Sequence, residues 1–246
     1  MSCIDIADRF LRRRIAVLDV RSRAWAAARA ELLPPGYTTA TCVSRLTAAG
    51  RVRRLKRGIY VVVDLARETP PVAIASGIFA EVDHYLTTDA ALAVHGLIDQ
   101  PLPTITVVLP TVRRPIPLGR SIVRPVTLGA ERFVTADAYS TTMEGYPVRL
   151  ASREQAVVDA LAEPGWMVHA SLLPEVLVAF DDDELAKTAE RALARSTAAG
   201  QRLGYLLDEA GREPPPELAS LRPTFAVELR PGSSRGPYST RWRVYG

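Results

Sequence analysis

The sequence predicts an α+β fold, and three observations support this prediction. Near the N-terminus, helix-like segments precede two short strand-like runs that carry a cluster of cations. Beyond residue 67, strand-like segments come first and helix-like segments follow, an order typical of an α+β domain. The charges are also divided, since residues 1–67 carry 14 Arg and Lys against 5 Asp and Glu, whereas residues 68–221 carry 12 against 21. A length of 246 residues favours two domains, which we expect to span residues 1–67 and 68–246.

The N-terminal segment is predicted to form three helices. Apolar residues from Ile4 to Leu18 recur at spacings that share a helix face, and a second helix is expected over residues 25–33. A third helix is expected over residues 39–49, because Thr38 or Thr39 can cap its first turn and Gly50 suits its end. In this helix Val43, Leu46 and Ala49 are spaced so that they can face a core.

Two short strands follow, over about residues 52–55 and 59–63, and they are joined around Arg57-Gly58. Gly58 supplies the positive φ that such a turn needs. Helices followed by a basic two-stranded hairpin are the signature of a winged helix-turn-helix. The sequence therefore predicts a DNA-binding domain in residues 1–67.

DNA recognition requires cations along the phosphates and short polar side chains at base edges. The third helix would be the recognition helix and the hairpin would be the wing. A solvated cationic surface is the alternative interpretation of the wing charges, and the hairpin and the charge of residues 1–67 favour DNA. The candidate DNA-binding residues are Thr39, Thr41, Ser44 and Arg45 on the helix, and Arg51, Arg53, Arg54, Lys56 and Arg57 on the wing.

The second domain begins after Pro70-Pro71, where the composition changes. A capping-box spacing from Ser152 to Gln155 marks the start of one of its helices. The expected helices span residues 72–82, 88–95, 152–161, 169–180, 183–196 and 200–210, and the expected strands span residues 84–86, 105–109, 122–126, 146–150 and 225–229. This domain is therefore expected to be mixed α/β with a helical C-terminal portion.

Several classes of protein are excluded by composition and motif. Two cysteines are too few for a disulfide framework or a cysteine-rich zinc site, and apolar runs are too short for a membrane helix. The N-terminus lacks the order of a signal peptide, so we expect a cytoplasmic protein. The three histidines have no metal-ligand spacing, and Walker A and Rossmann patterns are absent. We therefore assign no catalytic residue, metal or cofactor, and expect a protein that is not an enzyme.

Two further features have structural interpretations. The acidic run from Asp181 to Glu184 is expected to cap a helix rather than to hold a divalent ion. Cys42 is expected to be a small core residue of the third helix.

Five segments in order resemble one family. They are LKRGIYVV (55–62), YLTTDAALAVHGL (85–97), ITVVLPTVRR (105–114), YPVRLASREQAVVDAL (146–161) and GQRLGYLLDEAG (200–211). From about residue 36 onward the chain is similar to the AbiEi family, the antitoxin and transcriptional regulator of type IV toxin–antitoxin systems.

This resemblance implies two activities. The winged domain would bind double-stranded DNA at an inverted repeat in its own promoter and act as a repressor of the operon. The C-terminal antitoxin domain would counteract a nucleotidyltransferase-like toxin, without requiring a stable complex with it. Arg53, Arg54, Lys56 and Arg57 would then contact phosphates, and the helix residues would contact bases.

Two other functions stay open at this point. One is a stand-alone winged-helix transcription factor with a C-terminal ligand-sensing domain, and the other is a nuclease acting on the bound DNA. The segment of residues 68–221, which carries a net negative charge, is expected not to contact the DNA. Residues 222–246 carry 5 Arg against 1 Glu, and they either extend the DNA contact or fold back onto acidic surface.

Overall fold

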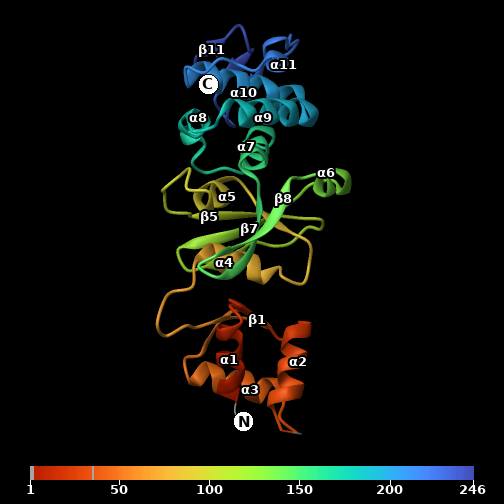
Figure 1. Cartoon of the computed structure of the whole chain (residues 1–246), viewed down its shortest axis with the longest axis vertical. Helices are drawn as coiled ribbons and strands as arrows, with labels where there is room; N and C mark the ends of the chain where they lie inside the picture. Colours follow the sequence, from red (N-terminus) through yellow and green to blue (C-terminus); the bar gives the residue numbers. More distant parts are fainter. Residues whose placement is uncertain (1–2, 35) are drawn as a thin grey trace. The chain divides into compact units, whose positions relative to one another are not determined.

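The computed structural model of the protein describes residues 3–34 and 36–246. Its mixture of helices and sheets confirms the predicted α+β class (Figure 1). The chain divides into two compact units. Unit 1 takes in the described residues up to Leu86 together with Val107–Phe133 and Ser140–Arg149, and unit 2 takes in Thr87–Thr106, Val134–Tyr139 and Leu150–Gly246.

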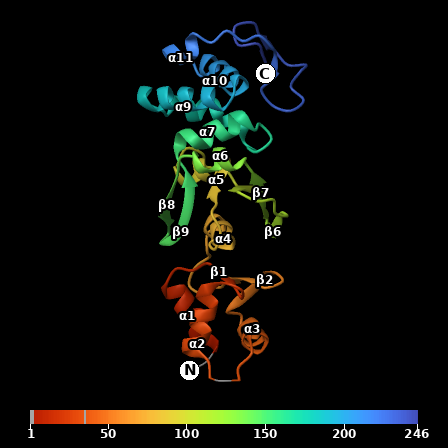
Figure 2. The ribbon, with the colours of Figure 1, turned by 90° about the vertical axis from the view of Figure 1, so that its right-hand side faces the viewer.

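The N-terminal part of unit 1 combines three helices with a small antiparallel sheet. Its elements in chain order are α1 (Cys3–Arg12), β1 (Val17–Asp19), α2 (Arg23–Leu32), α3 (Thr39–Ala48), β2 (Val52–Lys56) and β3 (Ile59–Val62). The strand order is β1-β3-β2. Figure 2 shows the three helices together with β1 and β2. Ser22 caps α2, because its Oγ atom accepts a hydrogen bond from the backbone N–H of Trp25 at 3.0 Å.

One prediction for this region is wrong. The apolar residues up to Leu18 were expected to share one helix face, but α1 ends at Arg12 and Leu18 lies in the strand β1. Arg14 has a φ of 54°, which turns the chain out of the helix. Leu18 then pairs with Tyr60 of β3. A contact between segments so far apart in the sequence cannot be inferred from local spacing.

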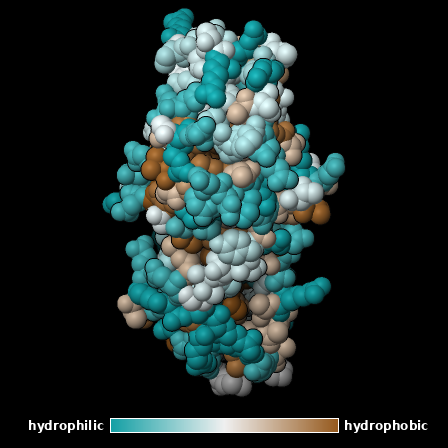
Figure 3. Space-filling view, turned by 45° about the horizontal axis from the view of Figure 1, so that its top comes forward, coloured by the Kyte–Doolittle hydropathy of each residue, from teal (hydrophilic) through white to brown (hydrophobic). Residues whose placement is uncertain are grey.

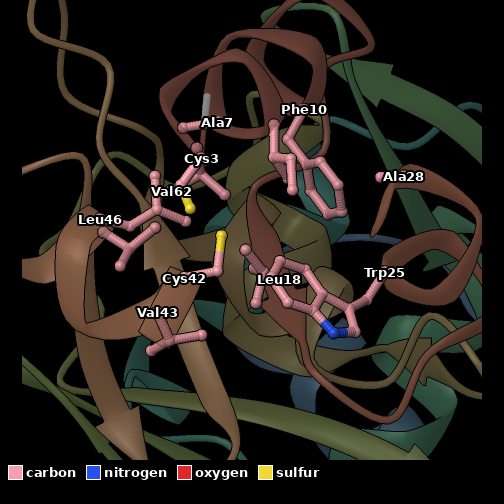
Figure 4. Close-up of a cluster of buried hydrophobic side chains, with 12 residues drawn as sticks. Cys3, Ala7, Phe10, Leu18, Trp25, Ala28, Cys42, Val43, Leu46 and Val62 are labelled. Atoms are coloured by element: carbon pink, nitrogen blue, oxygen red, sulfur yellow. The ribbon is translucent and has the colours of Figure 1, made fainter. Parts of the chain in front are cut away.

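The helices and the small sheet enclose one hydrophobic core (Figure 4). Phe10 of α1, Trp25 of α2 and Leu46 of α3 are each at most 2% exposed. The Cys3 and Cys42 side chains lie close together in this core. Because all three helices contribute to it, the core holds α3 and the β2–β3 hairpin in one packed body.

The structure contains a six-stranded sheet with the strand order β6-β7-β5-β4-β9-β8. Its strands are β4 (Tyr85–Leu86), β5 (Thr104–Leu109), β6 (Ile116–Leu118), β7 (Ser121–Thr127), β8 (Ala138–Met143) and β9 (Tyr146–Ala151). The helices in this stretch of sequence are α4 (Pro71–Ile78), α5 (Thr88–Val94) and α6 (Ala130–Val134). Antiparallel pairing joins Tyr85 to Val108 and Ile116 to Val123. The predicted strands at β4, β5, β7 and β9 are confirmed, whereas β6 and β8 were not predicted.

The C-terminal part of unit 2 is largely helical, as predicted. Its elements are α7 (Arg153–Ala162), the short 3-10 helix η1 (Ala170–Leu172), α8 (Leu173–Val178), α9 (Asp182–Arg195), α10 (Thr197–Glu209), α11 (Pro216–Ala219), β10 (Val227–Glu228), β11 (Tyr238–Ser239) and β12 (Val244–Tyr245). The helices α7, α9 and α10 pack against one another. In Figure 1 they form the green-to-blue group.

The basic C-terminal tail folds back onto α10. Arg241 pairs with Asp208 at 3.0 Å, and the Trp242 indole N–H donates to the same carboxylate at 2.6 Å. Gln201 donates to the carbonyl oxygens of Phe225 and Trp242, both at 2.9 Å. Of the two alternatives left open for the tail, this places at least Arg241 on acidic surface of its own unit.

The molecular surface is mainly hydrophilic on the face drawn in Figure 3. Among the described helices, none combines the length and the apolar character that crossing a lipid bilayer requires.

Candidate nucleic-acid interface

The helix α3 has a capped first turn and a buried inner face. The Thr38 Oγ1 atom accepts a hydrogen bond from the backbone N–H of Thr41 at 3.1 Å, which confirms the predicted cap. Cys42, Val43 and Leu46 are buried against the core. The inner face of α3 is therefore fixed by packing, and the opposite face is presented to solvent.

The opposite face carries three of the predicted DNA-binding residues. Thr41, Ser44 and Arg45 are all exposed. The Thr41 and Thr38 hydroxyls share a hydrogen bond of 2.8 Å. The Arg45 guanidinium lies over the Tyr37 ring, 5.1 Å from its centroid, and donates to the Tyr37 hydroxyl. Tyr37 thus holds Arg45 in a defined orientation at the surface.

Thr39, the fourth predicted helix residue, has a different environment. Its Oγ1 atom accepts hydrogen bonds from the Arg29 guanidinium at 3.1 Å and from the Trp25 indole at 3.4 Å. Both donors belong to α2. Thr39 therefore ties the start of α3 to α2, and its hydroxyl is already engaged within the protein.

The β2–β3 hairpin, residues 52–62, presents a row of cations. The strands pair antiparallel, and the register shifts between Arg54 and Lys56. Gly58 has a φ of 83° at the turn, a conformation that favours glycine. Arg53, Arg54, Lys56 and Arg57 are exposed. Within the part of the chain that the structure describes, no ion pair engages the three arginines.

Arg51, the remaining predicted wing residue, is placed differently. It is half-buried and forms an ion pair with Asp8 of α1. Its backbone N–H donates to the carbonyl of Leu46 at 2.9 Å. Arg51 therefore links α1 to the segment between α3 and β2, and it positions the hairpin rather than extending the exposed row of cations.

Charges from two other segments lie near Lys56. The pKa of Lys56 is below its ordinary value, first because of partial burial and then because of the charges of Arg21 and Arg113, which Asp19 opposes. Burial alone would raise the pKa of the Asp19 carboxyl, but hydrogen bonds from Arg21 and the charges of Arg21 and Lys56 lower it. Cations from three segments thus share one electrostatic environment, where a bound anion would be stabilised.

Buried polar groups elsewhere in the chain serve the fold. Asp89 is 1% exposed, and its carboxylate accepts hydrogen bonds from the backbone N–H groups of Val168 at 2.8 Å and His169 at 2.9 Å. The same carboxylate lies 2.8 Å from Nδ1 of His169. Asp89 therefore holds the segment before η1 against the start of α5, which is a structural role.

A second buried carboxylate lies in the same unit. Asp159 of α7 is fully buried and accepts hydrogen bonds from the Thr87 hydroxyl at 2.7 Å and from the Gln155 amide at 2.9 Å. Over residues 3–34 and 36–246, no group of three His, Cys, Asp or Glu side chains is arranged to hold a metal ion.

The predicted cap of the acidic run is confirmed. The Asp181 carboxylate accepts from the backbone N–H of Glu184 at 2.8 Å, and the Glu184 carboxylate accepts from the backbone N–H of Asp181 at 3.0 Å. This is a capping box at the start of α9.

Comparison with known proteins identifies the family. The family model of the AbiEi antitoxin C-terminal domain matches residues 85–209, just over half of the chain, from β4 to the end of α10. The chain belongs to the AbiEi antitoxin family. This confirms the predicted resemblance. AbiEi antitoxins are regulatory proteins, and an antitoxin implies a toxin as its partner.

A solved structure extends the similarity beyond the matched domain. The crystal structure of the RV2827C protein from Mycobacterium tuberculosis has a TM-score of 0.66 to this AbiEi-family chain, at 16% sequence identity. The similarity covers 97% of this chain and 89% of that chain. At this identity it shows a shared fold. No curated protein matches the sequence.

Sequence reasoning missed two cations that the structure of this AbiEi-family protein brings to the hairpin. Arg21 follows β1, and Arg113 lies between β5 and β6. Their place beside Lys56 depends on tertiary packing. The pair of arginines in ITVVLPTVRR was visible in the sequence, but its position next to the hairpin was not.

Proposed function

We propose that this protein is the DNA-binding antitoxin of a type IV toxin–antitoxin system. Residues 1–67 would form a winged helix-turn-helix that represses its own operon, and residues 68–246 would counteract a nucleotidyltransferase-like toxin. One observation carries the DNA-binding part. The exposed polar face of α3 is followed directly by a hairpin with four exposed cations, Arg53, Arg54, Lys56 and Arg57. Among the described residues, no carboxylate forms an ion pair with the three arginines of this hairpin.

The two surfaces suit different parts of a duplex. Thr41, Ser44 and Arg45 on α3 can reach base edges in the major groove, where Arg bound to guanine is the commonest specific contact. The hairpin cations suit phosphates, which fix position without reading sequence. Four such contacts correspond to a slope of log K against log salt of about −4.

The wing assignment is tested by charge reversal. In Arg54→Glu/Arg57→Glu, we expect weaker binding to the operator and to unrelated duplexes alike, because a general phosphate contact is lost. The salt dependence should become shallower by about 2 in slope. Electrophoretic mobility shift or fluorescence anisotropy at several salt concentrations measures both quantities.

A matched control separates this effect from net charge. Lys187→Glu reverses one charge at an exposed position of unit 2, and it should bind DNA with nearly the wild-type slope, whereas Arg54→Glu alone should reduce the slope. Unchanged binding by Arg54→Glu/Arg57→Glu would contradict the wing assignment.

The antitoxin part has its own test. We expect a nucleotidyltransferase-like gene beside the gene of this protein. In a growth assay, the full-length protein should relieve the toxicity of that gene's product. A regulator that senses a small molecule would instead give no rescue, and its DNA binding would depend on the ligand. A footprint over an inverted repeat would show two copies with two-fold related placement.

A further inference from the structure

An exposed loop of unit 1 lies beside the basic hairpin. It comprises residues 110–115, between β5 and β6, and every residue in it is exposed. Strand β6 packs against β2 of the hairpin. Both segments belong to the same compact unit, although the predicted domain boundary at residue 67 falls between them in the sequence.

The loop adds two cations to those of the hairpin. Arg113 is close enough for its charge to influence Lys56, which Arg21 also influences. Arg114 follows directly and is exposed. Among the described residues, neither arginine forms an ion pair with a carboxylate. Mutual repulsion of these cations is relieved when a polyanion binds.

The loop is also restricted in conformation. Pro110 and Pro115 stand at its two ends, and each proline fixes its own φ. Strand β6 is held by antiparallel pairing of Ile116 with Val123 and Leu118 with Ser121. A short loop anchored in this way loses less conformational entropy when it binds than a flexible tail does.

We propose that the loop of residues 110–115 is a second phosphate-binding element, in which Arg113 and Arg114 contact the DNA backbone next to the hairpin. The proposal rests on the DNA-binding function proposed above. Duplex DNA is the occupant that fits, because the loop continues the cationic row of the hairpin, and a repeating line of phosphates matches cations contributed by separate segments. The acidic composition of residues 68–221 therefore does not keep this part of the second domain off the DNA.

The experiment uses the full-length chain and two duplexes, the operator and an unrelated sequence of equal length. In Arg113→Gln/Arg114→Gln, the slope of log K against log salt should decrease in magnitude by about 2, since each phosphate contact contributes about 0.9. The loss of affinity should be similar for both duplexes, because the contacts carry no sequence information. Hydroxyl-radical footprinting should show lost protection at one side of each half-site.

Two comparison variants make the outcome decisive. Lys187→Gln, which removes one exposed charge from unit 2, should retain the wild-type slope, whereas Arg113→Gln alone should reduce its magnitude by about 1. Circular dichroism and thermal melting establish that each variant is folded. Substitutions at exposed positions usually change the free energy of unfolding very little.

The possible results separate the two proposals. A wild-type slope for the loop variant, together with a reduced slope for Arg54→Glu/Arg57→Glu, would overturn the loop proposal and leave the wing intact. Wild-type slopes for both would overturn the loop proposal and the wing assignment together, whereas no binding to either duplex by the wild-type chain would refute the DNA-binding function itself. Retained DNA binding with lost toxin neutralisation by the loop variant would assign the loop to an acidic protein partner and would also overturn the proposal.

Discussion

Gly204 shows how a single residue determines packing in the C-terminal part of the chain. It lies in α10, and a Cβ atom added at this position would fall inside van der Waals contact distance of the Trp242 ring. Trp242 is 1% exposed and is also held by its hydrogen bond to Asp208. The absence of a side chain at residue 204 therefore allows the tail to cover α10.

Gly204→Ala is expected to destabilise the protein. The added methyl group forces the indole or the helix to shift, at a cost of about 1–3 kcal/mol in the free energy of unfolding. The better helix propensity of Ala offsets about 1 kcal/mol of this cost. Urea unfolding followed by tryptophan fluorescence measures the change. Gly129→Ala is the control, because a Cβ at Gly129 meets open space, and equal stability of both variants would contradict the packing role of Gly204.

Cys42 is expected to be an inert thiol. Burial first, and then the hydrogen bond with Cys3, raise the pKa of Cys42 from 9.0 to about 12. Because the thiolate is the reactive form, native protein at pH 8 should resist alkylation at Cys42 and react fully in urea. Peptide mass spectrometry after timed labelling checks this. Rapid native labelling at Cys42 would show that the core opens locally.

The same pKa shift has a consequence for stability. Between pH 9 and pH 12 the unfolded chain loses the Cys42 proton while the folded chain keeps it. This contribution to stability is therefore complete below pH 9 and decreases as the pH rises through that interval.

At the scale of an element, the start of α9 allows the effect of a capping residue to be distinguished from the effect of a neighbouring charge. Asp181→Ala removes the carboxylate that accepts the hydrogen bond from the backbone N–H of Glu184. It should lower the free energy of unfolding by about 1 kcal/mol. Asp183→Ala removes an exposed charge of the same helix turn without touching the cap, so it should cost only a few tenths of that. Thermal melts of the two variants decide between a capping and a purely electrostatic role.

Elements with strong local signals could be predicted from the sequence. The α3 helix was found from the Thr38 cap and the spacing of Val43 and Leu46, and the hairpin was found from its β-branched residues and Gly58. Strand β1 was missed, because Val17–Asp19 is only three residues long and is defined by pairing with β3. The short strand β6, Ile116–Leu118, was missed for a similar reason, since its pairing with β7 defines it.

The candidate site was predictable to a similar extent. The row of exposed hairpin cations follows from the sequence pattern, and so does the outward face of α3. The environments of Arg51 and Thr39 do not, because their partners Asp8, Arg29 and Trp25 are on other helices. Local spacing indicates which way a side chain points, whereas tertiary contacts decide whether its polar groups are already bonded to another residue of the protein.

At the scale of the whole molecule, repression and neutralisation are expected to be separable. Arg54→Glu/Arg57→Glu should no longer repress a promoter fusion, while it should still rescue growth in the presence of the toxin. The reason is that both positions lie on the hairpin, outside the residues matched by the antitoxin domain. Growth and reporter assays in one strain, at equal protein levels by immunoblot, measure the two activities. Loss of rescue would mean that neutralisation requires DNA binding.

The position of β2 gives its cations another consequence. Because β3 lies between β1 and β2, β2 is an outer strand of its sheet, and among the described residues β3 is the strand that pairs with it by hydrogen bonds. Such a strand can template the addition of another chain, and charged side chains prevent this. Two copies meeting at β2 would bring Arg53, Arg54 and Lys56 together with like charges. We therefore expect the residues proposed to bind phosphates also to disfavour association through β2 while no DNA is bound.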